Sequence, residues 1–168
     1  MKILVVVDMQ KDFIDGALGT PEAVAIVPAV KALIKDFPGK VYFTRDTHFD
    51  NYMSTEEGKH LPVPHCIKDT EGWQIHPELD ALRTTTPIDK LTFGSRELID
   101  LLAKEQDVEC VTLCGLCTDI CVISNALLIK AYYPEIPIYV PSIACAGVTP
   151  ESHQNALNAM KMCQIEIL

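Results

Sequence analysis

Four of the seven cysteines in this 168-residue chain lie between positions 110 and 121, at Cys110, Cys114, Cys117 and Cys121. Such a group can be a metal site, a redox pair, a disulfide framework, core packing, or one nucleophile among bystanders. Here a short apolar run, VECVTLC, passes into a helical pattern that begins near Thr118. The choice among these roles depends on the chemistry that the rest of the chain offers.

Cys121 has a position that suits a nucleophile. With Thr118 as the N-cap, Cys121 is the third helical residue, where backbone N–H groups lack partners and the helix dipole favours an anion. The pKa of a thiol there can fall from about 8.5 to roughly 3.5–7.5. Core packing is the alternative role for a cysteine of this kind. An acid and a lysine at the same place favour the nucleophile.

The neighbouring cysteines have weaker claims to chemistry. Cys114 and Cys117 have the spacing of a redox pair, but Cys114 falls in the predicted strand instead of at the start of the helix. No second CxxC pair or nearby histidines complete a zinc site. We therefore predict that Cys110 and Cys114 pack in the core. A redox pair at Cys114 and Cys117 remains the alternative.

Asp8 and Lys90 supply the acid and the cation. Asp8 directly follows the apolar run at 3–7, where burial of a carboxylate is costly unless it has partners. Asp8 could instead cap the next segment, and Lys90 could be a solvated residue at a strand end. No glycine-rich turn follows the first strand, so dinucleotide binding is disfavoured. Together, Asp8, Lys90 and Cys121 would form a proton acceptor, a charge partner and a nucleophile.

Histidines and acids also gather between positions 46 and 65. Asp46 and His48 lie two residues apart, which puts both side chains on one side of an extended chain. Glu57, His60 and His65 follow in the same polar segment. A lone loop histidine is usually solvated, but histidine together with carboxylate suits zinc, manganese or iron. We therefore expect a divalent-metal site in this segment.

Charge and hydropathy restrict the partners. The net charge of −9, with no run of Lys and Arg, argues against nucleic acid and anionic membranes as partners. No apolar stretch approaches the roughly 18 residues of a membrane span, and the run at 3–7 is too short for a signal peptide. An odd number of cysteines without an export signal indicates reduced thiols. We expect a cytoplasmic protein.

Apolar runs alternate with helical patterns along the chain. Strands are predicted at 3–7, 40–44, 86–90, 108–114, 136–140 and in the final CQIEIL, and helices at 26–37, 96–105, after Thr118, and at 150–162. Pro28 is expected in the first turn of its helix. This alternation predicts a mainly parallel, six-stranded sheet in a three-layer α/β/α, Rossmann-like fold. One domain spans 1–168, with a long polar connection over 46–85.

The predicted fold also brings the reactive residues together. In open parallel sheets, ligands bind outside the carboxyl ends of the strands. Asp8, Asp46, Lys90 and Cys121 each follow or end a different predicted strand. They should therefore meet at one edge of the sheet.

Three motifs resemble a known family. VVVDMQKDF at 5–13, IDKLTFGS at 88–95 and CGLCTDICV at 114–122 resemble the isochorismatase-like cysteine hydrolases, among them the nicotinamidases. The resemblance covers nearly the whole chain and implies the isochorismatase-like fold. It implies that Asp8, Lys90 and Cys121 are a catalytic triad. It also implies a cis peptide at Leu116–Cys117 and an oxyanion hole formed by the amides of Cys117 and Cys121.

The resemblance further implies ligand positions. It gives Asp46, His48 and His65 as metal ligands, with Glu57 or, as the alternative, His60 as the fourth; zinc is expected, and manganese or iron is admissible. Phe13 and Phe93 match aromatic residues of the substrate pocket. Some nicotinamidases carry a Trp before the Pro-x-His element, where this chain has the sequence LPVP at 61–64. One pocket wall should therefore be less aromatic.

The implied activity is hydrolysis of a small carboxamide, with nicotinamide converted to nicotinate and ammonia through a thioester. A homo-oligomer is a further expectation. The alternatives are another amidase or isochorismatase-type hydrolase on the same fold, a non-catalytic binding protein, and a thiol redox protein. The family's vinyl-ether hydrolases do not use the cysteine, so Cys121 favours amide chemistry.

Overall fold

The computed structural model describes all 168 residues, and its core is built around strand β1 (Lys2–Val7). Residues 3–7 have no exposed surface. β1 pairs with a parallel strand on each side and belongs to one hydrophobic cluster of 35 buried residues. Parallel strands covered on both faces favour continuous apolar, β-branched runs of this kind. The prediction of a strand buried on both faces is confirmed.

At least one helical segment separates each pair of consecutive strands along the chain. The other strands are β2 (Lys40–Asp46), β3 (Ile88–Lys90), β4 (Cys110–Leu116), β5 (Ile138–Val140), β6 (Cys145–Ala146) and β7 (Glu166–Ile167). The α-helices are α1 (Lys11–Ile14), α2 (Pro21–Asp36), α3 (Glu56–His60), α4 (Pro77–Asp80), α5 (Arg96–Leu102), α6 (Ile123–Tyr132) and α7 (Pro150–Met162). Three further helical turns are η1 (Tyr52–Ser54), η2 (Thr118–Val122) and η3 (Ser142–Ala144).

All strand pairings are parallel. The strand order is β3-β2-β1-β4-β5-β7, and β6 also pairs with β4. The sheet therefore has seven strands, and the prediction of six is wrong by one. β6 consists of two residues, Cys145 and Ala146, which pair with Gly115 and Leu116. So short a strand leaves no periodic signal in a sequence.

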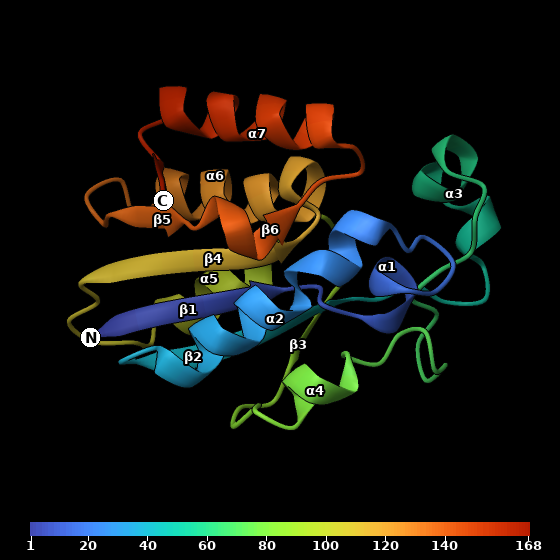
Figure 1. Ribbon diagram of the computed structural model, residues 1–168, viewed down its shortest axis with the longest axis horizontal. Coiled ribbons are helices and arrows are strands. Elements are labelled where there is room, and N and C mark those ends of the chain that lie inside the picture. Colours follow the sequence, from blue (N-terminus) through green and yellow to red (C-terminus); the bar gives the residue numbers. More distant parts are fainter.

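Helices cover both faces of the sheet, which confirms the three-layer α/β/α prediction. In Figure 1, α2 and α4 lie in front of the strands and α5 and α6 lie behind them. α2 contacts α4 and β4, while α6 contacts both α5 and α7. None of the helices has both the length and the apolar character that a membrane crossing requires.

Helix starts follow side-chain caps. Thr20 accepts a hydrogen bond from the amide of Ala23, so α2 begins at Pro21. The predicted start at residue 26 is therefore wrong, and Pro28 lies inside the helix and not in its first turn. Ser95 and Thr149 cap α5 and α7, which begin as predicted, although α5 ends at Leu102 and not at 105.

The strand register sets the geometry of the carboxyl edge. β2 and β3 pair so that Asp46 lies opposite Lys90, and β1 and β4 pair so that Val7 lies opposite Gly115. Gly115 has a φ of +113°, and a Cβ there would lie 2.2 Å from the carbonyl oxygen of Val7. Only glycine permits this close approach. The residues after β1 and β4 are thereby brought together.

Candidate active site

A buried ammonium group lies at the centre of the carboxyl edge. Lys90 Nζ is 2.6 Å from Asp8 Oδ2, 3.3 Å from Asp46 Oδ1 and 3.3 Å from Cys121 Sγ. The side chains of Lys90 and Asp8 have no exposed surface. Burial lowers the pKa of Lys90, but the charges of Asp8, Cys121 and Asp46 outweigh that effect and raise it well above its usual value. The structure thus brings together all three residues of the predicted triad.

Asp8 is held in an uncommon backbone conformation, with a φ of +45°. Its Oδ1 accepts a hydrogen bond of 2.6 Å from the hydroxyl of Thr44, whereas its Oδ2 accepts no well-aligned hydrogen bond and lies 2.6 Å from the Lys90 ammonium. Burial raises the pKa of Asp8, Lys90 lowers it and Asp46 raises it again, with a net increase. A carboxylate with a raised pKa and one open oxygen is well suited to accept a proton.

Thr44 was missed in the sequence, although a signal for it exists. It lies on β2 two residues before Asp46, so both side chains point to the same side of the strand. The amide of Asp8 also donates to its hydroxyl, at 3.2 Å. Thr44 therefore holds both the backbone and the carboxylate of Asp8.

The pKa of Cys121 differs from the expectation. The residue Cys121 is 4% exposed. Burial, the charge of Asp8 and a hydrogen bond to Asp8 raise the pKa of Cys121 well above its usual value, against the lowering effect of Lys90. The predicted lowering of this pKa is therefore wrong. This raised pKa keeps the proton on sulfur in the free protein, beside Asp8.

The turn that carries Cys121 is not capped by Thr118. The N-cap position falls at Cys117, and the amide of Val122 donates to the carbonyl of Cys117 at 3.0 Å, which makes η2 a wide π-helical turn. Thr118 Oγ1 instead lies 2.7 Å from Nδ1 of His153 on α7. The peptide bond between Leu116 and Cys117 is cis, as the resemblance implied.

A buried amide links this turn to the segment after β3. Asn125 Nδ2 donates to the carbonyl of Cys121 at 2.8 Å and to the carbonyl of Phe93 at 3.1 Å, and its Oδ1 accepts from the amide of Ser95. Asn125 has no exposed surface. Its contacts fix Cys121 relative to Phe93, which was the second aromatic residue predicted for the pocket.

The other cysteines do not share this environment. All seven thiols are free, so Cys114 and Cys117 form no disulfide. Cys114 is fully buried in the core cluster and Cys110 is also buried. Burial raises the pKa of Cys114 well above its usual value and that of Cys117 to about 12. These thiols are poor nucleophiles and poor redox partners in this state.

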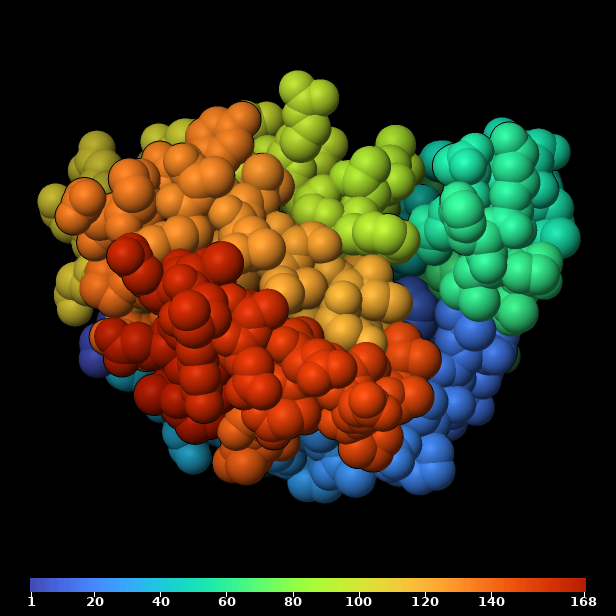
Figure 2. Space-filling model, turned by 90° about the horizontal axis from the view of Figure 1, so that it is seen from above, coloured from blue at the N-terminus to red at the C-terminus, as the bar shows by residue number.

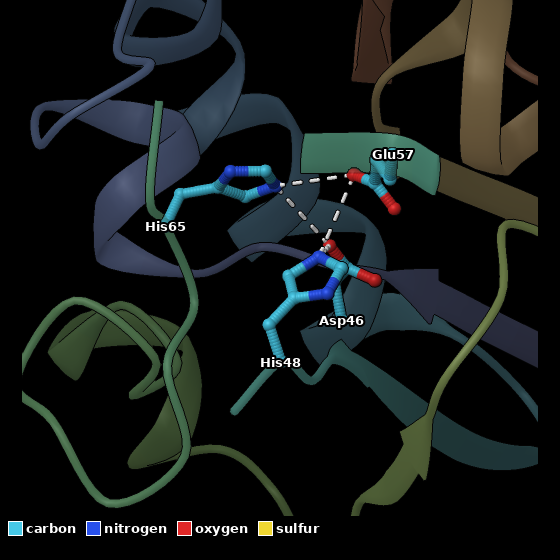
Figure 3. Close-up of side chains that lie close together, drawn as sticks. All are labelled: Asp46, His48, Glu57 and His65. Carbon is cyan, nitrogen blue, oxygen red and sulfur yellow. Dashed lines mark hydrogen bonds and ion pairs between the residues drawn. The ribbon is translucent and has the colours of Figure 1, made fainter. Parts of the chain in front are cut away.

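Four predicted metal-binding side chains converge beside the triad. Figure 3 shows Asp46, His48, Glu57 and His65 pointing toward one another, and one donor atom from each lies within 4.8 Å of all the others. Nε2 of His65 is 3.5 Å from both Asp46 Oδ2 and Glu57 Oε1, and Nε2 of His48 is 2.9 Å from Asp46 Oδ2 and 3.5 Å from Glu57 Oε1.

These distances fit one bound ion. Ligand atoms about 2.1 Å from a tetrahedral ion lie about 3.4 Å from one another. Nδ1 of His65 donates to the carbonyl of Val63 at 2.8 Å, which leaves Nε2 free as a ligand. Burial lowers the pKa of His65, but Asp46 and Glu57 raise it to about 10. A cation would replace the proton that these carboxylates otherwise attract.

His60, the alternative fourth ligand, is outside this cluster. Its side chain is 80% exposed, and its Nε2 lies 3.3 Å from Glu56 Oε1. Tyr52 holds the segment that carries Glu57, because its hydroxyl donates to the carbonyl of Leu61 at 2.8 Å and its ring packs edge-on against His48. The geometry therefore favours Glu57 over His60.

Asp46 joins the two clusters. Its Oδ1 faces Lys90 and its Oδ2 faces both imidazoles. Burial opposes ionisation of Asp46, but hydrogen bonds to His48 and His65 and the charge of Lys90 hold its pKa well below its usual range. Gln10 fixes the backbone there, since its side chain accepts from the amide of Asp46 at 2.7 Å and donates to its carbonyl at 2.9 Å.

A cavity of about 820 Å³ opens above both clusters. Phe13, Phe93, Cys117, Cys121 and the four clustered donors are among the residues that line it. In Figure 2 the surface is notched between the teal segment that carries α3 and the yellow-green segment after β3. The edge thus offers a thiol beside a carboxylate and an ammonium group, with a set of metal donors in the same cavity.

Comparison with known proteins gives consistent matches along the chain. A model of the isochorismatase domain matches residues 2–168. The chain is 25% identical to the nicotinamidase/pyrazinamidase of Mycobacterium tuberculosis over 186 residues, which cover 100% of this chain and 98% of that protein. It is 24% identical to the nicotinamidase of Schizosaccharomyces pombe, over 98% of this chain and 91% of that protein.

A solved structure agrees closely in fold. The crystal structure of the pyrazinamidase of Pyrococcus horikoshii in complex with zinc superposes with a TM-score of 0.84, at 32% sequence identity. The match covers 99% of this chain and 98% of that one. The arrangement of strands and helices is therefore shared over nearly the full length of both chains.

The hydrogen bonds between Thr44 and Asp8 can be tested by replacing the Thr44 hydroxyl with a methyl group. Thr44→Val removes the hydroxyl, so the free energy of unfolding should fall by about 1–3 kcal/mol as the buried carboxylate loses a partner. Thr112→Val is the matched control, because Thr112 is 7% exposed on β4 and its hydroxyl makes no hydrogen bond. Urea unfolding measures both. Equal losses in the two variants would contradict a specific role for Thr44.

Proposed function

Since the chain belongs to the isochorismatase family, we propose that it is a cysteine hydrolase of a small carboxamide, with nicotinamide as the substrate. The observation that carries the proposal is the buried contact of Cys121 Sγ with Lys90 Nζ, at 3.3 Å, beside the Asp8 carboxylate. The nicotinamidase and pyrazinamidase relatives support the choice of a ring carboxamide. The rival is another small amide hydrolysed on the same site.

In the first half-reaction, Asp8 takes the proton from the Cys121 thiol and sulfur attacks the amide carbon. Lys90 offsets the negative charge that moves between the thiolate and the carboxylate. The backbone amides of Cys117 and Cys121 hold the oxyanion, and a donor of this kind contributes roughly 3–4 kcal/mol. Asp8 then returns the proton to nitrogen as the C–N bond breaks, and ammonia leaves a thioester on Cys121.

In the second half-reaction, Asp8 removes a proton from water, whose oxygen attacks the thioester carbon. The C–S bond breaks, the acid product leaves, and the sulfur recovers its proton from Asp8. The raised pKa of Asp8 supports this alternation between proton acceptor and proton donor. The net reaction consumes one water for each amide.

Asp46, His48, Glu57 and His65 would hold one divalent ion, with zinc expected and manganese or iron admissible. A bound ion would supply a Lewis acid for the ring nitrogen of the substrate. The chain's own part is to place those four donors in the same cavity as Cys121. Phe13 would contact the ring from beside His65, where its own ring lies 5.4 Å away, and Phe93 would contact it from the opening.

Three further properties belong to this proposal. The chain acts as one domain over 1–168, which the shared core cluster supports. It works in the cytoplasm, which the seven free thiols support. It assembles as a homo-oligomer, and exposed apolar side chains such as Ile143 and Met162, at 78% and 85%, are candidates for that contact.

The nucleophile is tested by Cys121→Ala. Ammonia release from nicotinamide should fall by at least about 10⁴-fold, because no other group can form the thioester. The fold should persist, since the substitution removes only one sulfur from the cavity floor. Cys163→Ala is the matched control, because its thiol is exposed, and it should retain full activity. More than a few per cent residual turnover in Cys121→Ala would remove this residue as nucleophile.

The metal site is tested by ion binding to the whole protein. Wild type should bind one zinc ion per chain, and His65→Ala and Glu57→Gln should each weaken binding by at least about 100-fold. His60→Ala should bind zinc as the wild type does, since His60 lies outside the cluster. Calorimetry measures the affinity. The reverse pattern, with binding lost in His60→Ala and kept in Glu57→Gln, would assign the fourth ligand to His60.

Removal of the ion by chelation should raise the KM for nicotinamide while iodoacetamide still alkylates Cys121 at a similar rate. Wild-type KM and kcat in the metal-free protein would contradict the site. In that case a metal-free amidase of the same family becomes the better proposal.

A further inference from the structure

The cavity is larger than a single-ring amide needs. Its volume of about 820 Å³ lies in the upper part of the range of about 300–1,000 Å³ that is typical for drug-sized ligands. The reacting groups belong to its buried lining, since Cys121, Asp46 and His65 are 4%, 2% and 2% exposed. Asp46 Oδ1 and Cys121 Sγ both lie 3.3 Å from Lys90 Nζ, so the metal donors and the nucleophile are close together. A ring held between them leaves the outer part of the cavity free.

The outer part is apolar and exposed. Leu61, Leu91, Phe93 and Val148 line the cavity, and their exposed fractions are 38%, 59%, 42% and 52%. We call these four residues the outer wall. They are a third of the large hydrophobic residues that the protein exposes, and they come from three separate segments that line this one cavity. Exposed apolar side chains concentrated in this way mark a binding surface.

The charge of the lining restricts what can bind there. No Lys or Arg is among the residues that line the cavity, whereas the carboxylates of Asp46, Glu56 and Glu57 are. The protein as a whole carries a net charge of −9. An anionic group on the outer part of a ligand would face the apolar wall and the carboxylate of Glu56. His60 is the exposed histidine of the lining, and its Nε2 already lies 3.3 Å from Glu56 Oε1.

We propose that the preferred substrate is an aromatic primary carboxamide that carries a neutral, apolar substituent on its ring, seated against the outer wall. This inference rests on the proposed function, since it assumes that the amide end lies at Cys121. The occupant is part of the substrate and not a second copy of the chain, because the outer wall residues line the same cavity that contains the nucleophile. They surround its opening and do not form a separate flat face.

The test compares nicotinamide with derivatives that bear methyl, propyl or phenyl groups at ring position 5 or 6. The derivatives form two series, one substituted at position 5 and one at position 6. In at least one of them, kcat/KM should rise above that for nicotinamide by about fourfold for each methylene that becomes buried. A carboxylate at the same position should lower kcat/KM. Values that stay level or fall with increasing size in both series would overturn the proposal.

Substitutions in the outer wall test whether these residues cause the preference for substituted rings. Leu91→Asn and Val148→Asn should reduce the ratio of kcat/KM for the propyl derivative to that for nicotinamide. Leu127→Asn and Val24→Asn are matched controls, because these side chains are 38% and 49% exposed and lie outside the cavity. The ratio should not change in the controls. A ratio that is unaffected by Leu91→Asn and Val148→Asn would overturn the proposal. Dissociation of a wild-type dimer in these variants would also overturn it, because the outer wall would then bind a second copy of the chain.

Failure of the proposed function is recognised separately. If neither nicotinamide nor any derivative is hydrolysed, the amide chemistry is wrong. Calorimetry of the same derivatives binding to zinc-loaded Cys121→Ala then still tests whether the outer wall binds the substituent. Affinity that increases with substituent size supports it, and affinity that does not increase overturns it.

Discussion

The burial of the Lys90 ammonium group is the constraint on which the rest of the site depends. A cation without solvent is stable only if anionic groups surround it, and Asp8 and Asp46 fill that role from the ends of β1 and β2. Those strands must therefore end at one edge in a fixed register, which the pairing of Asp46 opposite Lys90 provides. The positive charge of Lys90 in turn stabilises either anion, the Asp8 carboxylate or the Cys121 thiolate. A proton can therefore pass between these two residues inside the protein.

Asp46 extends this constraint to the candidate metal donors. One of its oxygens faces Lys90 and the other faces His48 and His65, so the position of the triad and that of the donor cluster are not independent. Gln10 and Thr44, which hold the backbone of Asp46 and the carboxylate of Asp8, keep both groups in place. A substrate that spans the two clusters would therefore meet a rigid site, as catalysis by preorganised groups requires.

The sequence allowed the fold class and the meeting of the site residues to be predicted, because strand ends and parallel order follow from local patterns. It could not reveal that Thr118 contacts His153 on α7 and does not cap a helix, since that contact depends on tertiary packing. The pKa of Cys121 was mispredicted for a related reason: helix position is visible in a sequence, but complete burial beside Asp8 is not. The choice of Glu57 over His60 likewise required the path of the chain around α3.

The central claim is that Cys121 forms a covalent acyl intermediate in this buried charge network. Mass spectrometry of the intact protein, quenched with acid within milliseconds of mixing with nicotinamide, tests it most directly. We predict a nicotinoyl adduct that maps to the peptide containing Cys121 and disappears as the substrate is consumed. Steady release of ammonia with no adduct on that peptide, or with an adduct on another cysteine, would contradict the account.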